Sequence, residues 1–186
     1  MRKATPQDAT AVIPLISSAI GEIGYVLTGA TNEAEMLDVL ESFFRQQGNR
    51  LSHDHVYVLE RDGAVAGFVL AYHGKDIERL DAPIKRRLQQ LGLPDEGIVP
   101  EARADEYYLD SVAVHPSFQG QGLGTLLIRE FEQQALRLGH HKVLLIVDVD
   151  NPRAKALYER LGYKPDGWLE IGGHAYERMI KQPDGL

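Results

Sequence analysis

The sequence predicts a single α/β (α+β) domain over residues 1–186, with a mixed, twisted central sheet of about six or seven strands flanked by helices. Three observations lead to this fold class. The second half of the chain alternates strand, helix and strand, an order that forms a right-handed parallel crossover. In the first half, an Asp-Gly turn separates two apolar runs and indicates an antiparallel hairpin. A chain of 186 residues can also bury a full core without disulfides.

Each element expected in the first half has its own local signal. Asp8 begins a helix that contains Pro14 in its first turns. Asn32 caps a second helix, which Gly48 ends. Apolar runs on both sides of the turn at 60–63 predict two strands. In chain order, the elements are a strand at 2–5, the helix from Asp8, the helix from 32 to 48, and strands at 55–59 and 64–72.

Residues 74–105 form an insertion of helix and loop between the two halves. The stretch 77–91 reads as a helix with charge all round, and Pro83 is the point at which it could divide. Residues 92–105 then form a long loop, and loops of this length are usually functional or mobile. The insertion and the final hairpin are also candidate surfaces for a homodimer.

The second half shows clearer periodicity. Residues 107–114 alternate between the two faces of a strand, and the unbroken apolar run at 143–147 is typical of a strand covered on both faces. Asn151 and Pro152 begin a helix. In order, the elements are a strand at 107–114, a helix from 123 to 139, a strand at 143–147, a helix from 151 to 162, and a hairpin of strands at about 163–171 and 174–181.

Composition excludes several classes of partner and chemistry. The chain has 27 acidic and 20 basic residues and a net charge of −7, whereas a broad nucleic-acid surface needs clustered Lys and Arg. It has no cysteine, which excludes disulfides, thiolate metal ligands and a cysteine nucleophile. The histidines show no metal-ligand spacing beside carboxylates, so no metal site is predicted.

No segment offers the run of about 20 apolar residues that a membrane helix needs. The longest apolar-leaning stretch, 11–27, is interrupted by Pro14 and Gly21. The N-terminus faintly imitates a signal peptide, but Asp8 intervenes and no small-x-small cleavage site follows. We therefore expect a cytoplasmic protein with no membrane partner.

The segment 119–125, Gln-Gly-Gln-Gly-Leu-Gly-Thr, lies between the strand at 107–114 and the next helix. Its alternating glycines allow positive φ, so that backbone N–H groups can point together at a helix start, where the dipole favours an anion. The dinucleotide pattern does not fit, because Thr125 or Leu127 stands where Gly or Ala is needed, and the P-loop lysine is missing. A pyrophosphate cradle and a merely tight connection both remain open.

Three motifs carry a resemblance to a known family. They are Val112-Ala113-Val114-His115-Pro116, then Gln119-x-x-Gly122-x-Gly124, then Asn151-x-x-Ala154-x-x-Leu157-Tyr158-x-x-x-Gly162-Tyr163. At this spacing, and in a strand-helix-strand-helix context, the chain is similar to the GNAT superfamily of acyl-CoA-dependent N-acyltransferases. The match is dense over residues 107–163 and looser toward both ends.

The resemblance implies an N-acetyltransferase that moves an acetyl group from acetyl-CoA to a primary amine, by direct attack through a tetrahedral intermediate. It implies parallel strands that splay apart at the cofactor, with the backbone of Val112 and Val114 bonding the pantetheine arm. Amides of 119–125 would hold the pyrophosphate, and Asn151 would face the pantetheine. The implied cofactor-binding residues are Val112, Ala113, Val114, Gln119, Gly120, Gln121, Gly122, Leu123, Gly124, Thr125, Asn151, Ala154 and Tyr158.

Tyr158 and Asp110 are the two candidate catalytic residues. The resemblance puts Tyr158 near the thioester sulfur, and a tyrosine, with an ordinary pKa near 10, can give a proton to an emerging thiolate. The amide of Val112 would donate to the oxyanion. On spacing alone, Tyr158 would be a core aromatic and Asn151 a helix N-cap.

The general base has three candidate sources. By the period of two, Glu106, Tyr108, Asp110, Val112 and Val114 share one face of their strand. A carboxylate in a sheet interior has a raised pKa, which favours base chemistry. Asp110 is therefore either the base or a structurally hydrogen-bonded group, whereas Glu106 is expected to be solvated. A chain of waters, which this family often uses, is the third source.

The acceptor is expected to be a small-molecule or peptide amine, and the negative net charge would suit a cationic one. Its pocket should form from the first two helices, the insertion at 74–105 and the final hairpin. Two other functions remain open. One is a non-catalytic acyl-CoA-binding or sensing module on the same fold, and the other is a structural or interaction domain whose glycine-rich turn binds nothing.

Overall fold

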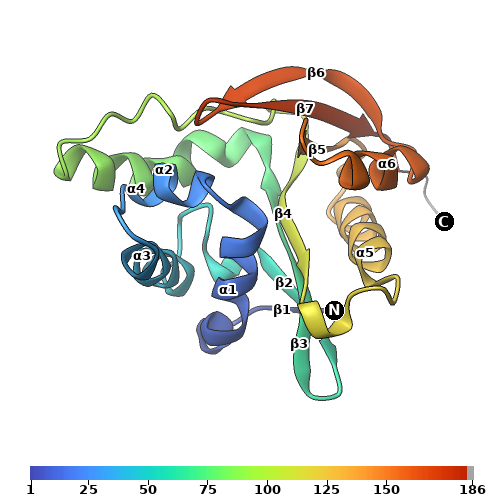
Figure 1. Cartoon of the computed structure of the whole chain (residues 1–186). Coiled ribbons are helices and arrows are strands. Elements are labelled where there is room, and N and C mark those ends of the chain that lie inside the picture. The colour runs from blue at the N-terminus through green and yellow to red at the C-terminus, as the bar shows by residue number, and fades with distance from the viewer. Residues whose placement is uncertain (184–186) are drawn as a thin grey trace.

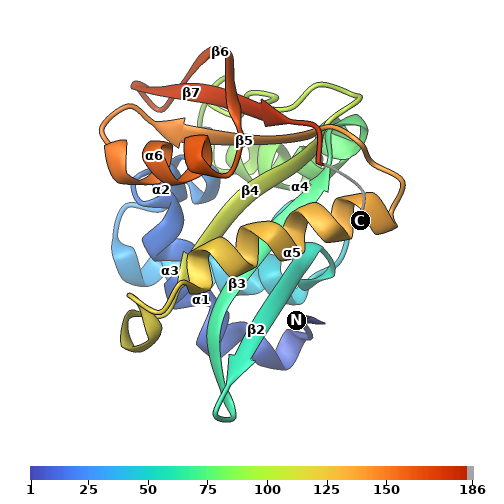
Figure 2. The same cartoon turned by 90° about the vertical axis from the view of Figure 1, so that its right-hand side faces the viewer.

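Seven strands form one sheet in the order β1-β2-β3-β4-β5-β7-β6. The computed structural model describes residues 1–183 and shows a strongly twisted sheet with helices against both faces (Figures 1 and 2). All neighbouring strands are antiparallel except β4 and β5, which are parallel, so the predicted mixed sheet is confirmed. The strands are β1 (Arg2–Lys3), β2 (Val56–Arg61), β3 (Ala64–His73), β4 (Tyr107–Val114), β5 (Val143–Asp148), β6 (Lys164–Ile171) and β7 (His174–Lys181).

The helices divide between the two faces of the sheet. On one face, α1 to α4 enclose a first core that includes Val12, Phe44 and Leu80. On the other face, α5 and α6 cover a second core that includes Leu127 and Phe131. The helices are α1 (Ala9–Ile20), α2 (Ile23–Thr28), α3 (Glu33–Arg45), α4 (Ile77–Gln90), α5 (Leu123–Arg137) and α6 (Pro152–Arg160).

The hairpin and helix-cap predictions are confirmed by the backbone. Asp62 and Gly63 both have positive φ, 52° and 77°, as a two-residue hairpin turn requires. The side chain of Asn32 accepts a hydrogen bond from the Glu35 amide and begins α3. Asn151 caps α6 in the same way. These signals act between near neighbours in the chain, which is why sequence reasoning finds them.

The short helix α2 was not predicted as a separate element. Gly21, with a φ of +52°, ends α1, and Gly29 ends α2 in the left-handed conformation. Gly24 lies where α2 meets α3. A Cβ at this position would lie only 2.5 Å from the Sδ atom of Met36, so a larger residue would not fit without a shift. The close approach of these two helices therefore depends on a glycine that the sequence alone marks only as an interruption.

Pro83 does not divide α4, which runs unbroken from Ile77 to Gln90. The residues that face the first core are Ile77, Leu80, Ile84 and Leu88, and all four are buried. Their burial compensates for the backbone hydrogen bond that a proline removes from a helix interior. The stretch after α4, residues 91–106, has no further helix or strand.

A β-bulge in β4 reverses the predicted faces of this strand. Leu70 pairs with Ser111 and Ala71 pairs with Leu109, so Asp110 is an extra residue without a partner in β3. Tyr108 packs in the first core, whereas Val112 and Val114 pack against the second. The prediction that Glu106, Tyr108, Asp110, Val112 and Val114 share one face is therefore wrong, because one extra residue inverts a period of two.

The parallel strands β4 and β5 separate after a short contact. Only Tyr107–Leu109 pair with Val143–Leu145. Beyond Leu109, no strand within residues 1–183 pairs with the β5-facing edge of β4. The predicted splay of the two parallel strands is confirmed, and it opens a gap in the middle of the sheet.

Within residues 1–183, the helices are too short or too polar to cross a membrane.

Candidate functional site

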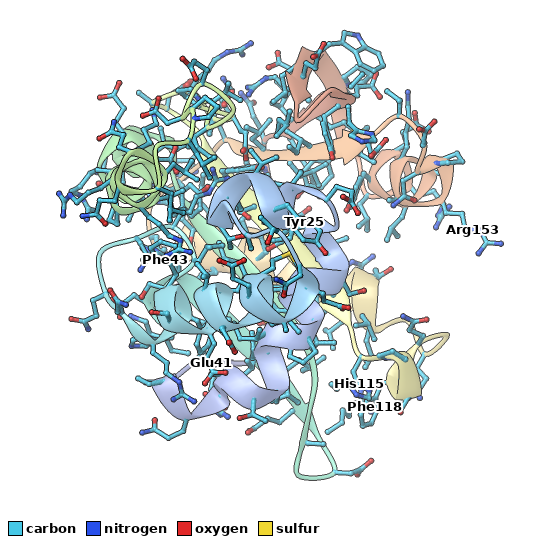
Figure 3. All side chains as sticks on the ribbon, turned by 60° about the vertical axis from the view of Figure 1, so that its left-hand side comes forward. Tyr25, Glu41, Phe43, His115, Phe118 and Arg153 are labelled. Carbon is cyan, nitrogen blue, oxygen red and sulfur yellow. The ribbon has the colours of Figure 1, made fainter. Side chains whose placement is uncertain are left out.

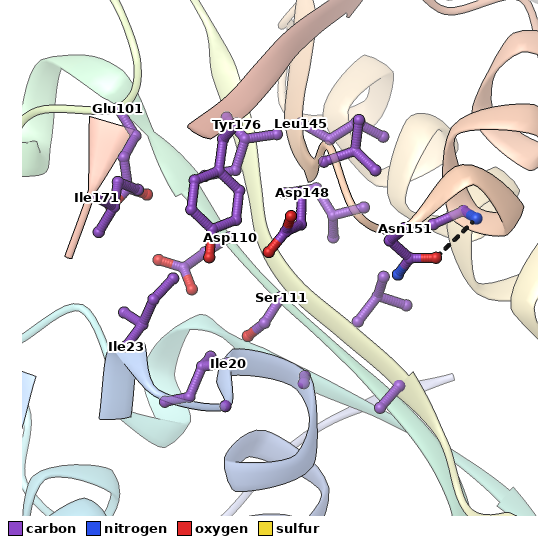
Figure 4. Close-up of a pocket in the computed structure, with 18 of the residues that line it drawn as sticks. Ile20, Ile23, Glu101, Asp110, Ser111, Leu145, Asp148, Asn151, Ile171 and Tyr176 are labelled. Atoms are coloured by element: carbon purple, nitrogen blue, oxygen red, sulfur yellow. Dashed lines mark hydrogen bonds between the residues drawn. The ribbon is translucent and has the colours of Figure 1, made fainter. Parts of the chain in front are cut away.

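A pocket of about 630 Å³ occupies the gap between the splayed strands. Its walls come from the α1–α2 turn, β4, β5, the start of α6, and the β6–β7 hairpin (Figure 4). The α1–α2 turn and the β6–β7 hairpin belong to the segments expected to form an acceptor pocket. No described residue of α3 lines the pocket, however, and Glu101 is its only lining residue from 74–105. Arg50, which follows α3, lines it instead.

The pocket brings together most of the predicted site residues. The members that line it are Asp110, Val112, Ala113, Val114, Gln119, Asn151, Ala154 and Tyr158. The remaining predicted residues, 120–125, continue from Gln119 into the start of α5 and do not themselves line the pocket. Segments far apart in sequence therefore meet at one site, with the glycine-rich loop at its edge.

The loop at 120–125 has the geometry of an anion cradle. Gly120 and Gly122 have φ values of +74° and +76°, and a Cβ added at either of them or at Gly124 would meet no atom within 4 Å. The amides of residues 120–125 donate no hydrogen bond within the described chain, and no side chain caps α5. Unpartnered amides at a helix start bind phosphate groups well, so these residues fit a pyrophosphate.

The edge of β4 offers a second set of backbone groups. Val112 pairs with Val69 of β3 on one side, while its other side faces the gap left by β5. An extended ligand can occupy such an edge as an added strand, with main-chain hydrogen bonds. This arrangement fits the pantetheine arm that the resemblance implies for Val112 and Val114.

Helix α6 directs Asn151 and Tyr158 toward the pocket. The Asn151 Oδ1 atom accepts a hydrogen bond of 3.1 Å from the Ala154 amide, which leaves its amide nitrogen available (Figure 4). Lys155 forms a 2.6 Å ion pair with Glu177 and fastens α6 to β7. Burial raises the pKa of Tyr158 to about 12, so the phenol remains protonated at neutral pH.

Asp110 is held by two residues, Arg50 and Tyr72, at the bulge in β4. Its Oδ2 atom accepts hydrogen bonds from Arg50 Nη2, at 2.6 Å, and from the Tyr72 hydroxyl, at 2.6 Å. The second oxygen, Oδ1, makes no hydrogen bond within the described chain. One oxygen of Asp110 therefore has the structural hydrogen bonds that were one of the two predicted roles. The residue nevertheless lines the pocket.

Arg50 is the centre of a buried cluster of charges. It is 3% exposed and forms ion pairs with Asp81, Glu101 and Asp110, at 3.3, 2.8 and 2.6 Å. Burial raises the pKa of Asp81 and of Glu101, and the nearby guanidinium opposes both shifts. Tyr108 donates a hydrogen bond to Glu101. One positive charge is therefore shared among three carboxylates behind the pocket.

Glu106 lies outside the pocket, and the expectation that it is solvated is wrong. It is fully buried, and its carboxylate accepts hydrogen bonds of 2.9 and 2.8 Å from Arg178. Lys142 lies 3.1 Å from the same carboxylate. Although burial alone would raise the pKa of Glu106, these hydrogen bonds keep it below its ordinary value. Glu106 has a structural role at the start of β4.

Two polar residues close to the motifs lie away from the pocket. The side chain of His115 accepts a hydrogen bond from the Ser117 amide and begins the turn after β4, beside Phe118 (Figure 3). Arg153 is exposed and projects outward from α6 in the same view. Neither residue lines the pocket.

Arg50, Ser111, Asp148 and Asp150 are among the polar residues of the pocket that sequence reasoning missed. Asp148 and Asp150 follow a fully apolar strand, and polar residues at the end of a splayed parallel strand could have been found by that position. Arg50 has no such signal, because its partners lie up to 60 positions away in the chain. Tyr176, on β7, also lines the pocket.

Comparisons with known proteins match both the fold and the sequence. A family model described as "Acetyltransferase (GNAT) family" matches residues 25–163. A solved structure titled as that of an acetyltransferase is 29% identical, with a TM-score of 0.77, and the match covers 97% of both chains. An N-acetyltransferase from Staphylococcus aureus Mu50 is 26% identical, with a TM-score of 0.79, over 97% of this chain and 98% of that one.

A third solved structure shares the fold alone. It is the ribosomal-protein-S18-alanine N-acetyltransferase from Escherichia coli, at 20% identity and a TM-score of 0.59, over 97% of this chain and 90% of that one.

Proposed function

Because this chain belongs to the GNAT acetyltransferase family, we propose that it uses acetyl-CoA to acetylate a primary amine. One observation carries the proposal. The free edge of β4 lines a pocket that also carries several carboxylates, and the unpartnered amides of 120–125 continue from Gln119 at the edge of this pocket. The strand edge and the amides suit a thioester cofactor with a pyrophosphate, and the carboxylates suit an amine.

The reaction needs a bond from the amine nitrogen to the acyl carbon, while the carbon–sulfur bond breaks. The amine loses one proton, and the departing thiolate gains one. Acetyl-CoA supplies the activated acyl group, and the protein supplies position and proton transfer. The amide of Val112, on the free edge of β4, is our candidate donor to the developing oxyanion.

Tyr158 is our candidate acid for the thiolate. It lines the pocket from α6, and its raised pKa keeps a proton on the phenol until a strong base forms nearby. Asn151, about two turns earlier, caps the helix with its oxygen and offers its nitrogen to the ligand. Tyr158 therefore combines packing in the core with a role in the site, and Asn151 combines helix capping with a role in the site.

Asp110 is our candidate for contact with the amine. Its Oδ2 atom is bonded to Arg50 and Tyr72, and Oδ1 is left for a substrate N–H. Hydrogen bonds from a guanidinium stabilise the charged carboxylate, so Asp110 is well suited to hold an ammonium in the pocket. Glu106 is excluded from this role by its place outside the pocket.

Thermal melting with and without acetyl-CoA tests the proposal, with NAD and ATP as controls. At a concentration about 100 times its dissociation constant, acetyl-CoA should stabilise the fold by about 2.7 kcal/mol. A panel of amines, read by release of free thiol, should then give turnover. A folded protein that acetyl-CoA does not stabilise would overturn the proposal. Binding without turnover on any amine would favour the sensing module.

A further inference from the structure

The charges that line the pocket are strongly unbalanced. The lining includes five carboxylates, Glu22, Glu101, Asp110, Asp148 and Asp150, and a single guanidinium, Arg50. Arg50 is already shared among buried carboxylates. Apart from His174 at the hairpin tip, the described lining has no other basic side chain. A substrate carboxylate would find no free cation here, whereas an ammonium would find several acids.

Three of these acids have no counter-charge in the protein. Within residues 1–183, Glu22, Asp148 and Asp150 form no ion pair. Asp148 is the best positioned of the three, because its Oδ1 atom accepts a 2.8 Å hydrogen bond from the Asp150 amide and fixes the carboxylate at the end of β5. Tyr176 pairs with Asp148 across β5 and β7, and burial together with the nearby carboxylate raises the pKa of that phenol, so the side-chain neighbour of Asp148 is a neutral hydroxyl and not a cation.

A buried hydroxyl gives independent support for a polar ligand. Ser111 is only 7% exposed, it lines the pocket, and its Oγ atom has no hydrogen-bond partner in the described chain. Buried polar groups are rarely left unpaired, so this hydroxyl is available to a polar group that enters the pocket. Figure 4 shows Ser111, Asp110, Asp148 and Tyr176 around the same space. A primary amine can both donate to this hydroxyl and accept from it.

The opposite wall is apolar. Ile20 and Ile23 from the α1–α2 region face the pocket, together with Ile171 from the hairpin (Figure 4). Leu27 of α2 also lines it. A chain of methylene groups can pack against these side chains while its charged ends reach the acids. The combination of an aliphatic wall, unpaired carboxylates and a lone hydroxyl describes an aliphatic amine with more than one positive charge.

We propose that the acceptor is an aliphatic diamine or polyamine, and that Asp148 binds its second, non-reacting ammonium. The proposal rests on the function proposed above and assigns the substrate class. The reacting nitrogen lies at Ser111 and Asp110, next to Val112 on β4, and the alkyl chain packs against the isoleucines. Asp148 is then a specificity residue, outside the proton-transfer machinery.

Three acceptors of similar length test the substrate class. With saturating acetyl-CoA, 1,4-diaminobutane should exceed 1-aminobutane in kcat/KM by about tenfold, the effect of one added charge-assisted contact. The zwitterion 4-aminobutanoate should be slower than both, because its carboxylate meets acidic side chains. Equal kcat/KM for the diamine and the monoamine would overturn the proposal.

The variant Asp148→Asn tests the assigned residue. It should raise KM for 1,4-diaminobutane about tenfold, leave kcat nearly unchanged, and leave KM for 1-aminobutane and acetyl-CoA within about twofold. Asp38→Asn is the matched control, since Asp38 is an exposed aspartate on α3 outside the pocket, and it should change none of these values. If folded Asp148→Asn had an unchanged KM for the diamine, the proposal that Asp148 binds the second ammonium would be wrong.

Calorimetric binding separates failure of this inference from failure of the proposed function. The wild-type protein is titrated with acetyl-CoA and, separately, with 1,4-diaminobutane. If acetyl-CoA does not bind, the proposed function fails. If acetyl-CoA binds and a monoamine or a peptide is acetylated without any advantage for the diamine, only the substrate class fails. Heat of diamine binding that Asp148→Asn abolishes supports the inference without any turnover.

Discussion

Tyr158 illustrates how burial controls the protonation state of a single side chain. Its ring lies against the second core and meets Tyr163 edge-on, with centroids 6.1 Å apart. Burial disfavours the phenolate and raises the pKa to about 12. A group of this kind keeps its proton in the resting enzyme, so the phenol is present as the acid whenever a thiolate forms nearby. The same packing that makes Tyr158 look like a core residue therefore keeps its hydroxyl protonated, while its place in the pocket wall makes it a candidate acid.

Tyr158→Phe should lower kcat about 100-fold or more, the usual contribution of a positioned general acid. Its dissociation constant for acetyl-CoA should stay within about twofold, because only the hydroxyl is removed. The acid form exists below the pKa of about 12, so the wild-type rate should show no loss from tyrosine ionisation up to about pH 10. Stopped-flow thiol release measures the rate.

Tyr57→Phe is the matched control for this change. Tyr57 lies on β2, outside the pocket, and its hydroxyl accepts a hydrogen bond from Gln134. It should leave kcat unchanged. Unchanged turnover in Tyr158→Phe as well would remove the acid assignment without excluding catalysis.

At the scale of elements, α5 carries a left-handed glycine at each end. Gly122 precedes the helix with a φ of +76°, and Gly139 follows it with a φ of +82°. A Cβ at either position would meet no atom within 4 Å. The two positions therefore share the same backbone demand and the same free space. They differ only in that Gly122 lies in the proposed cradle.

Gly122→Ala and Gly139→Ala should each cost about 1–2 kcal/mol of unfolding free energy, because both place an L-residue in the left-handed region. Only Gly122→Ala should weaken acetyl-CoA, by about tenfold or more, since its methyl group enters the space of the pyrophosphate. Urea unfolding and calorimetric titration measure the two effects. Equal acetyl-CoA affinity in both variants would contradict the cradle.

At the scale of the molecule, Arg50 connects four separate parts of the chain. The arginine follows α3, Asp81 lies on α4, Glu101 lies in the stretch after α4, and Asp110 lies on β4. One buried cation thus fixes the wall of the pocket to the helices of the first core. Such a cluster is costly to break, because removal of one partner leaves buried charges without compensation.

Arg50→Met should lower the free energy of unfolding by about 3–5 kcal/mol at neutral pH. The pH dependence has a definite sign. Asp81 and Glu101 already have raised folded-state pKa values, and loss of Arg50 raises them further. A group with a raised folded-state pKa loses its stabilising contribution as pH rises through that pKa. The deficit should therefore be smaller at pH 5 than at pH 8.

Arg79→Met provides the comparison in urea unfolding. Arg79 forms an exposed pair with Asp76 on the same helix region, and exposed pairs contribute little. Its loss should change the unfolding free energy by at most about 0.5 kcal/mol. If both variants lost equally little, Arg50 would not have the central role described above.

The sequence by itself determined the features that depend on near neighbours. The Asp62-Gly63 hairpin, the Asn32 and Asn151 caps and the positive φ of Gly120 and Gly122 were all predictable, because each follows from the local chemistry of a few consecutive residues. The succession of β4, α5 and β5 along the chain was predictable from the same kind of local pattern. The family resemblance rests on several such patterns at a particular spacing.

Only the tertiary structure decided which face of β4 each residue occupies and what surrounds Asp110. The bulge depends on pairing with β3, and the pocket acids depend on strands that separate, so neither leaves a periodic trace in the sequence. Arg50 reaches Asp110 across 60 residues of chain, because packing of the helices on the sheet brings them together. Local sequence preferences therefore determine which helices and strands form, whereas the packing of these elements determines which charged residues meet in the site.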